Sequence, residues 1–154
     1  MTEPSTPSTQ PAVDPALIAR VKGIILQPKT EWARIDGEFA TTRSLFTRYA
    51  MILAAIGPIC SLIGGQLLPL FGTPMSILGA LLVAVVSYGL SLVAVYLLGL
   101  IINALAPSFG GASDSVQAMK VAVYSYTAMW LVGVFGLIPM LGVLAILGLY
   151  SFYL

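Results

Sequence analysis

Residues 49–113 read YAMILAAIGPICSLIGGQLLPLFGTPMSILGALLVAVVSYGLSLVAVYLLGLIINALAPSFGGAS and contain no Asp, Glu, Lys or Arg. A water-soluble element needs polar side chains on the face that meets solvent, so a run of this length indicates that the solvent is lipid. A helix needs about 20 apolar residues to cross roughly 30 Å of hydrocarbon. Prolines and a glycine in residues 69–74 mark a turn. We predict a helical hairpin with spans over residues 49–68 and 75–106.

The composition of the whole chain agrees with a membrane protein. Hydrophobic residues make up 58% of it and charged residues 8%, against roughly 25% charged in a soluble domain. A net charge of +1 argues against a nucleic-acid partner, because proteins that bind nucleic acid normally carry a strongly basic face. The only cysteine, Cys60, cannot form an intramolecular disulfide, and we interpret it as a packing residue. The expected fold is therefore an all-α, polytopic transmembrane helical bundle whose first partner is the lipid bilayer.

The segment before the first span divides into two parts. Residues 1–13 are rich in Pro, Ser and Thr and predict a disordered tail. Residues 14–48 predict a short amphipathic helical arm, with Asp14 and Pro15 at its start. The apolar side chains of its first helix share one face: Leu17, Ile18, Val21, Ile24 and Ile25. This face either lies in the headgroup region or packs on the spans, and Trp32 in a second short helix has the same two interpretations.

Basic residues predict the orientation of the chain in the membrane. Six of the seven Lys and Arg residues precede the first span: Arg20, Lys22, Lys29, Arg34, Arg43 and Arg48. The seventh, Lys120, follows the second span. Because basic segments stay on the cytoplasmic side, we expect the arm and the loop at residues 107–113 to be cytoplasmic and the turn at residues 71–74 to face outward.

A third span is expected over residues 118–137. Gly110 and Gly111 permit a sharp chain reversal ahead of it. Asp114 followed by Gln117 resembles a capping box, which predicts a helix that starts near Ser115. Lys120 lies one turn into this helix, close enough for its side chain to reach back to the interface.

Residues 139–154 predict the beginning of a fourth span. Sixteen residues make only about 24 Å of helix, which is short of the roughly 30 Å hydrocarbon layer. No charged or polar residues follow to cap the last carbonyl groups. We therefore expect the chain to be an incomplete copy of a longer protein.

Small residues recur at helical spacing within the first two spans. Such residues let helix backbones approach closely, which is how helices gain packing energy in lipid. The spacing leaves open whether the contacts join helices of one chain or of two copies in a homo-oligomer. The candidate helix-packing residues are Gly57, Ser61, Gly65, Ala80, Ala84, Ser87, Ser91 and Ala94.

The residues for catalysis are missing from the sequence. It contains no histidine and one cysteine, which excludes His-based catalysis and thiolate metal clusters. We therefore expect no enzyme, no cofactor and no metal. Two classes remain: an adaptor or scaffold whose arm recruits a partner, and a transport or permeation component with helices interrupted at Pro58 or Pro139. The absence of charge within the spans favours the adaptor.

Several short stretches resemble the Yip1 domain family in its bacterial branch. They are Pro28-Lys29-Thr30-Glu31-Trp32, Phe109-Gly110-Gly111, Gln117-Ala118-Met119-Lys120, Tyr124-Ser125-Tyr126, Ile138-Pro139 and Leu149-Tyr150.

The resemblance implies a multi-pass membrane protein with a cytosolic N-terminus that continues beyond the position of Leu154. Eukaryotic members act in vesicle traffic between the ER and the Golgi and contact Rab GTPases, while bacterial members mostly lack an assigned activity. Gly57-Pro58 is at most a remnant of the Asp-Leu-Tyr-Gly-Pro element of the eukaryotic members. The resemblance therefore implies a bacterial inner membrane as the setting.

Overall fold

The computed structural model describes residues 15–67, 76–137, 149–151 and 153, and every regular element among them is helical. The predicted all-α fold is confirmed for this part of the chain. Three of its helical stretches are long and apolar enough to cross a membrane: Thr42–Gln66, Ile77–Phe109 and Ser115–Leu137. The expected tail, the turn at residues 69–74, Pro139 and most of the expected fourth span lie outside the described residues.

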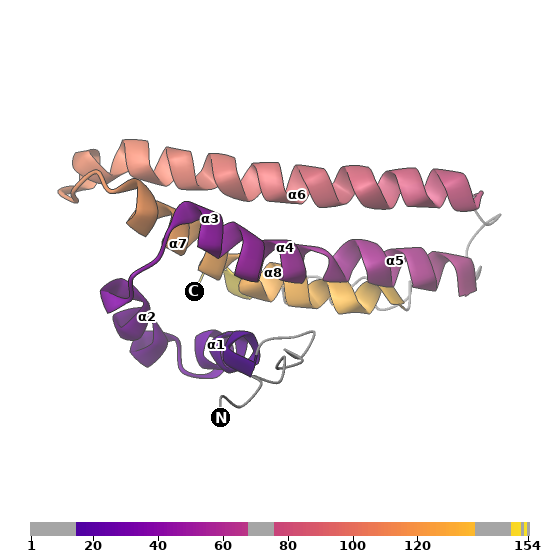
Figure 1. The fold of residues 1–154 in the computed structure, drawn as a ribbon, viewed down its shortest axis with the longest axis horizontal. Helices are drawn as coiled ribbons and strands as arrows, with labels where there is room; N and C mark the ends of the chain where they lie inside the picture. Colours follow the sequence, from indigo (N-terminus) through magenta and orange to yellow (C-terminus); the bar gives the residue numbers. More distant parts are fainter. Residues whose placement is uncertain (1–14, 68–75, 138–148, 152, 154) are drawn as a thin grey trace, which may run out of the picture.

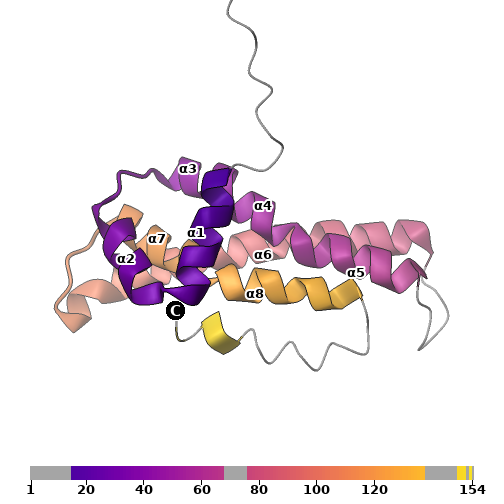
Figure 2. The same ribbon diagram turned by 90° about the horizontal axis from the view of Figure 1, so that it is seen from below.

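The arm consists of α1 (Pro15–Leu26) and α2 (Pro28–Gly37). Proline opens both helices, at a position where its missing N–H group has no intrahelical acceptor to lose. Helix α2 ends where Glu38 adopts an extended conformation. Figures 1 and 2 show α1 running across the direction of the spans, beside the end of the bundle at which α6 meets α7.

The first span is a helix with two irregularities. It contains α3 (Thr42–Leu45), the π-helical turn η1 (Phe46–Ala50), α4 (Met51–Ala54) and α5 (Ile56–Leu67). Thr41 caps it, since Thr41 and Ser44 exchange side-chain to backbone hydrogen bonds. Pro58 has no N–H group for the carbonyl of Ala54, which accounts for the break at Ala55. The span begins at Thr42, earlier than the expected Tyr49.

The second span is one long helix, α6 (Ile77–Leu105), extended by the 3₁₀ turn η2 (Ala106–Phe109). Its 33 residues make roughly 50 Å of helix, which exceeds the hydrocarbon layer. It ends at Gly110, whose φ of 80° is left-handed and therefore suits glycine.

The third span contains α7 (Ser115–Ser125), α8 (Thr127–Val132) and the 3₁₀ segment η3 (Gly133–Leu137). Asp114 caps it as predicted, accepting hydrogen bonds from the backbone N–H groups of Val116 and Gln117. The predicted capping box is wrong in its second half. The Gln117 side chain donates to the carbonyl of Asp36 in the arm, 3.2 Å away, instead of returning to the cap.

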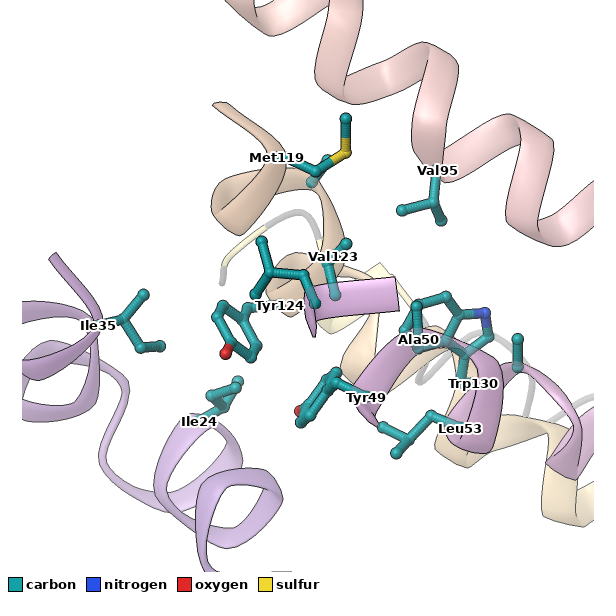
Figure 3. Packing of buried hydrophobic residues seen from close by; sticks show 13 residues of the cluster. Ile24, Ile35, Tyr49, Ala50, Leu53, Val95, Met119, Val123, Tyr124 and Trp130 are labelled. Carbon is teal, nitrogen blue, oxygen red and sulfur yellow. The ribbon is translucent and has the colours of Figure 1, made fainter. Parts of the chain in front are cut away.

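The hydrophobic core lies where the arm meets the spans. Half of the most apolar window of the third span is buried, against 6% for α6, so the third span is central and α6 is peripheral. Figure 3 shows side chains from α1, α2 and all three spans converging on one cluster. Its fully buried large side chains include Ile24, Ile35, Leu53, Val95 and Val123.

Candidate functional site

The junction between the arm and the spans carries most of the polar contacts, and Arg20 of α1 is at its centre. The Arg20 guanidinium donates to Glu31 of α2 at 2.6 Å and to Glu38 beyond α2 at 2.5 Å. It also lies 5.7 Å from the ring centre of Tyr124 in α7, a cation–π distance. Burial lowers the pKa of Arg20, but the hydrogen bond to Glu38 and the charges of Glu38, Tyr124 and Glu31 together raise the pKa by more, so the guanidinium stays charged.

Glu31 is the buried acid of the junction, with 7% of its surface exposed. It accepts from Arg20 and, more distantly, from Arg34 at 3.4 Å. Gly23 of α1 makes room for it, because a Cβ atom at Gly23 would lie 2.6 Å from the Glu31 carboxyl group. A buried carboxylate is costly without a paired cation, so Glu31 depends on Arg20.

Lys120 is buried, with 3% of its surface exposed. The prediction that its side chain reaches back to the interface is therefore wrong. Its ammonium group donates to the carbonyls of Ile35 at 2.8 Å, Asp36 at 3.4 Å and Glu38 at 2.7 Å. These carbonyls lie at the C-terminal end of α2, where backbone acceptors lack intrahelical donors and a cation complements the helix dipole. The lysine of the third span therefore caps a helix of the arm.

Aromatic rings fill the space beneath these charges. Tyr49 and Thr127 share a buried hydrogen bond of 2.8 Å, and the Tyr49 and Tyr124 rings meet edge to face at 4.8 Å. Trp32 contacts Tyr124 edge to face at 6.4 Å. Of the two interpretations of Trp32, the structure therefore gives packing on the spans. Its buried Nε1 has no hydrogen-bond acceptor among the described residues.

The other loop residues singled out from the sequence lie outside the junction. Gly110, Gly111 and Asp114 are exposed at the turn between α6 and α7. Across this turn Ser113 donates to Asn103 at 3.2 Å. Their geometry is that of a helix end, a reversal and a helix start.

The small residues of the first two spans face a cavity of about 510 Å³. Trp130 of α8 closes one side of it and donates from Nε1 to Ser91 at 3.0 Å. Ala94 is exposed and is not part of this wall. The predicted small residues that line the cavity are Gly57, Ser61, Gly65, Ala80, Ala84, Ser87 and Ser91.

The closest backbone approach joins α5 to η3 rather than α5 to α6. A Cβ atom at Gly133 would lie 2.6 Å from the Cα atom of Gly57, and one at Gly136 would lie 2.6 Å from the Ser61 hydroxyl. A Cβ atom at Gly64 would overlap the carbonyl of Gly136, whereas one at Gly65 would meet nothing within 4 Å. The predicted helix-packing residues did not include Gly64, Gly133 and Gly136, although the sequence shows Gly133 and Gly136 at helical spacing.

No group of three or more His, Cys, Asp or Glu side chains gathers in the described part of the chain. Arg20 and Glu31 pair with each other, and Lys120 pairs with backbone carbonyls.

A family model for the Yip1 domain matches residues 22–154. The chain belongs to the Yip1 domain family. The matched region begins within α1 and takes in α2, all three candidate spans and the whole junction apart from Arg20. No curated protein and no solved structure matches the chain. The Yip1 domain and the three helical stretches that are long and apolar enough to cross a membrane support a membrane protein.

Proposed function

We propose that this Yip1 domain protein is a non-enzymatic membrane adaptor, in which the spans form a base and the arm presents a docking surface to a protein partner. The observation that carries the proposal is the way in which the arm is attached. Arg20 and Lys120 tie α1 and α2 to each other and to α7 through buried or half-buried polar contacts. An arm held in this way offers a preformed surface. Little conformational entropy is therefore lost in the arm when a partner binds to it.

Phe39 marks the docking surface. It follows α2 and has 96% of its surface exposed. A fully exposed aromatic ring is typical of the anchor residues of protein interfaces. The exposed part of α2 beside it carries Lys29, Thr30, Ala33, Arg34 and Asp36.

The proposed setting is a bacterial inner membrane with the arm on the cytoplasmic side. The distribution of Lys and Arg supports this orientation, because all but one of these residues precede the end of the arm or lie in the first turns of the first span. Labelling of single cysteines with a membrane-impermeant thiol reagent, in a Cys60→Ser background, tests the orientation. Labelling of Thr30→Cys and Ser108→Cys from the cytoplasmic side only is expected, and labelling of Ser108→Cys from outside would contradict it.

Site-specific photocrosslinking in native membranes tests the adaptor function. A photoreactive phenylalanine analogue at Phe39 is expected to give discrete adducts with another protein. The same analogue at Leu82, which is 59% exposed on α6, serves as the control and should crosslink mainly to lipid. An absence of protein adducts at Phe39 and at Ala33 would remove the support for an adaptor.

Full-length protein is needed for this test. Deletion of residues 1–48 would strip Ile24, Ile35 and Leu45 from the core and leave Lys120 without its acceptors. Loss of a partner from such a deletion would therefore report unfolding as well as docking. A Phe39→Ser variant removes the exposed ring without touching the core.

The cavity between the spans favours permeation as the second candidate function. Ser61, Gln66, Ser87 and Ser91 give its wall some polar groups, and the first span is interrupted at Ala55, next to Ala54 in this wall. Flux of protons or K⁺ into vesicles that contain the purified protein, above that of empty vesicles, would support permeation over an adaptor. No flux above this background is expected from an adaptor.

A further inference from the structure

We infer that α1 is an in-plane anchor for an anionic phospholipid leaflet, with one apolar face turned toward the acyl chains and basic side chains set among the headgroups. This inference goes beyond the proposed adaptor function, because it needs no protein partner. Its starting point is the direction of α1, which runs across the spans and therefore along the membrane surface (Figures 1 and 2).

Two faces of α1 are already occupied. Ile24 is fully buried against the spans, and Leu17 and Val21 pack beside it. Arg20 and Gly23 form the face that meets α2, through the ion pair with Glu31 and the close approach of its carboxyl group.

The face opposite α2 carries apolar side chains and one lysine. At about 100° per residue, Ile18 and Ile25 share this face with Lys22, while Arg20 lies roughly 200° from Ile18 around the helix. The long Lys22 side chain can extend its ammonium group toward the headgroups. Ile18 is 51% exposed. Because α2 lies on the side of α1 toward the end of the bundle (Figure 1), this apolar face is turned toward the hydrocarbon-facing part of the spans.

Charge complementarity selects an anionic surface for this face. The described arm and first turns of the first span hold six basic and three acidic side chains. Glu31 and Glu38 are bound to Arg20, so Asp36 is the acid with no ion pair in this segment. The exposed basic residues that form no ion pair within the described part of the chain are Lys22, Lys29, Arg43 and Arg48.

These two features together describe an interfacial helix. Such a helix buries its apolar face at the boundary between headgroups and acyl chains, and nearby Lys and Arg side chains strengthen its binding to anionic lipid. A zwitterionic surface would satisfy the apolar face but would leave the excess positive charge unmatched.

Spin labels at two neighbouring positions of the full-length protein test the inference. Single cysteines replace Ile18 or Ala19 in a Cys60→Ser background, and the purified protein is placed in nanodiscs of phosphatidylcholine with or without phosphatidylglycerol. Both sites are exposed, but they lie about 100° apart on α1. In anionic discs, the label at residue 18 should collide with oxygen several-fold more than with a water-soluble nickel chelate, and the label at residue 19 should show the lower ratio.

The role of charge is tested by the double substitution Lys22→Gln with Lys29→Gln. The oxygen-to-nickel ratio at residue 18 should fall in this variant, and it should fall by a similar factor when phosphatidylglycerol is omitted. The two changes made together should add little, because each removes one side of the same attraction.

Three results would overturn the inference. Equal ratios at residues 18 and 19 in anionic discs would show that the apolar face meets water. Low collision with both reagents at residue 18 would show that protein covers the face. An oxygen-to-nickel ratio at residue 18 that changes neither with lipid charge nor with the substitution of the two lysines would show that anionic headgroups are not recognised.

Discussion

The Lys120 ammonium group donates a 2.8 Å hydrogen bond to the carbonyl oxygen of Ile35, although the two residues are 85 positions apart in the sequence. Lys120 belongs to a membrane span and Ile35 to the last turn of an arm helix. One side chain thus fixes the end of α2 against α7 from a buried position.

Replacement of Lys120 by Met is expected to detach the end of α2. The thioether keeps the length of the side chain but leaves the carbonyls of Ile35 and Glu38 without their charged donor, which costs about 2–3 kcal/mol. Hydrogen exchange of α2 and the thermal unfolding of the purified protein measure the effect. Lys22→Met on the exposed surface is the control and should change the free energy of unfolding by less than about 0.5 kcal/mol.

Arg20 and Glu31 should be strongly coupled. Arg20→Gln leaves a buried carboxylate without its main cation and is expected to destabilise the protein by about 2–4 kcal/mol. The double variant with Glu31→Gln should recover a large part of this loss, because the uncompensated charge is gone. Unfolding of the two single variants and the double variant in one detergent measures the coupling, and strictly additive losses would contradict the ion pair.

The backbone contact between Gly57 and Gly133 predicts a difference between two glycine substitutions. Gly133→Ala places a Cβ atom 2.6 Å from the Gly57 Cα atom, and this overpacking should cost about 1–3 kcal/mol. Gly65→Ala meets no atom within 4 Å and should leave thermal stability unchanged or slightly raised. Equal melting temperatures for both variants would show that α5 and η3 do not approach so closely.

Ser91→Ala is expected to destabilise the bundle by about 1–3 kcal/mol, because it leaves the Trp130 Nε1–H group without its acceptor. Ser87 provides a matched control on the same helix. Its hydroxyl bonds to Val83 and Ala84 of its own helix, so Ser87→Ala should have little effect. Thermal unfolding compares the two, and Trp130 fluorescence should shift in the Ser91 variant alone.

Local features of the chain could be predicted because their causes lie within a few residues. The charge-free run of residues 49–113 required a lipid solvent, and the proposed spans over residues 75–106 and 118–137 overlap the observed helical stretches. Asp114 could be recognised as a cap because a capping side chain reaches backbone groups only two or three positions away.

The junction and the closest backbone contacts depend on tertiary structure. From sequence alone, a lysine one turn into a membrane helix is expected to extend toward the headgroups. Lys120 turns inward because the fold brings the carbonyl end of α2 within its reach. Likewise, the spacing of small residues around Gly57 indicated a packing face but did not identify the helix that packs against it.

The sequence by itself determined that this protein is helical, that its helices are apolar enough to span a membrane and that the third span starts at Ser115, since hydrophobicity and capping act over short distances along the chain. Only the tertiary structure decided that Lys120 caps the arm, that Arg20 joins Glu31 to Glu38, and that Gly57 meets Gly133. A charged side chain, or the backbone of a glycine, can contact many chemically equivalent groups. Which of these groups it contacts depends on which helices the folded chain brings together.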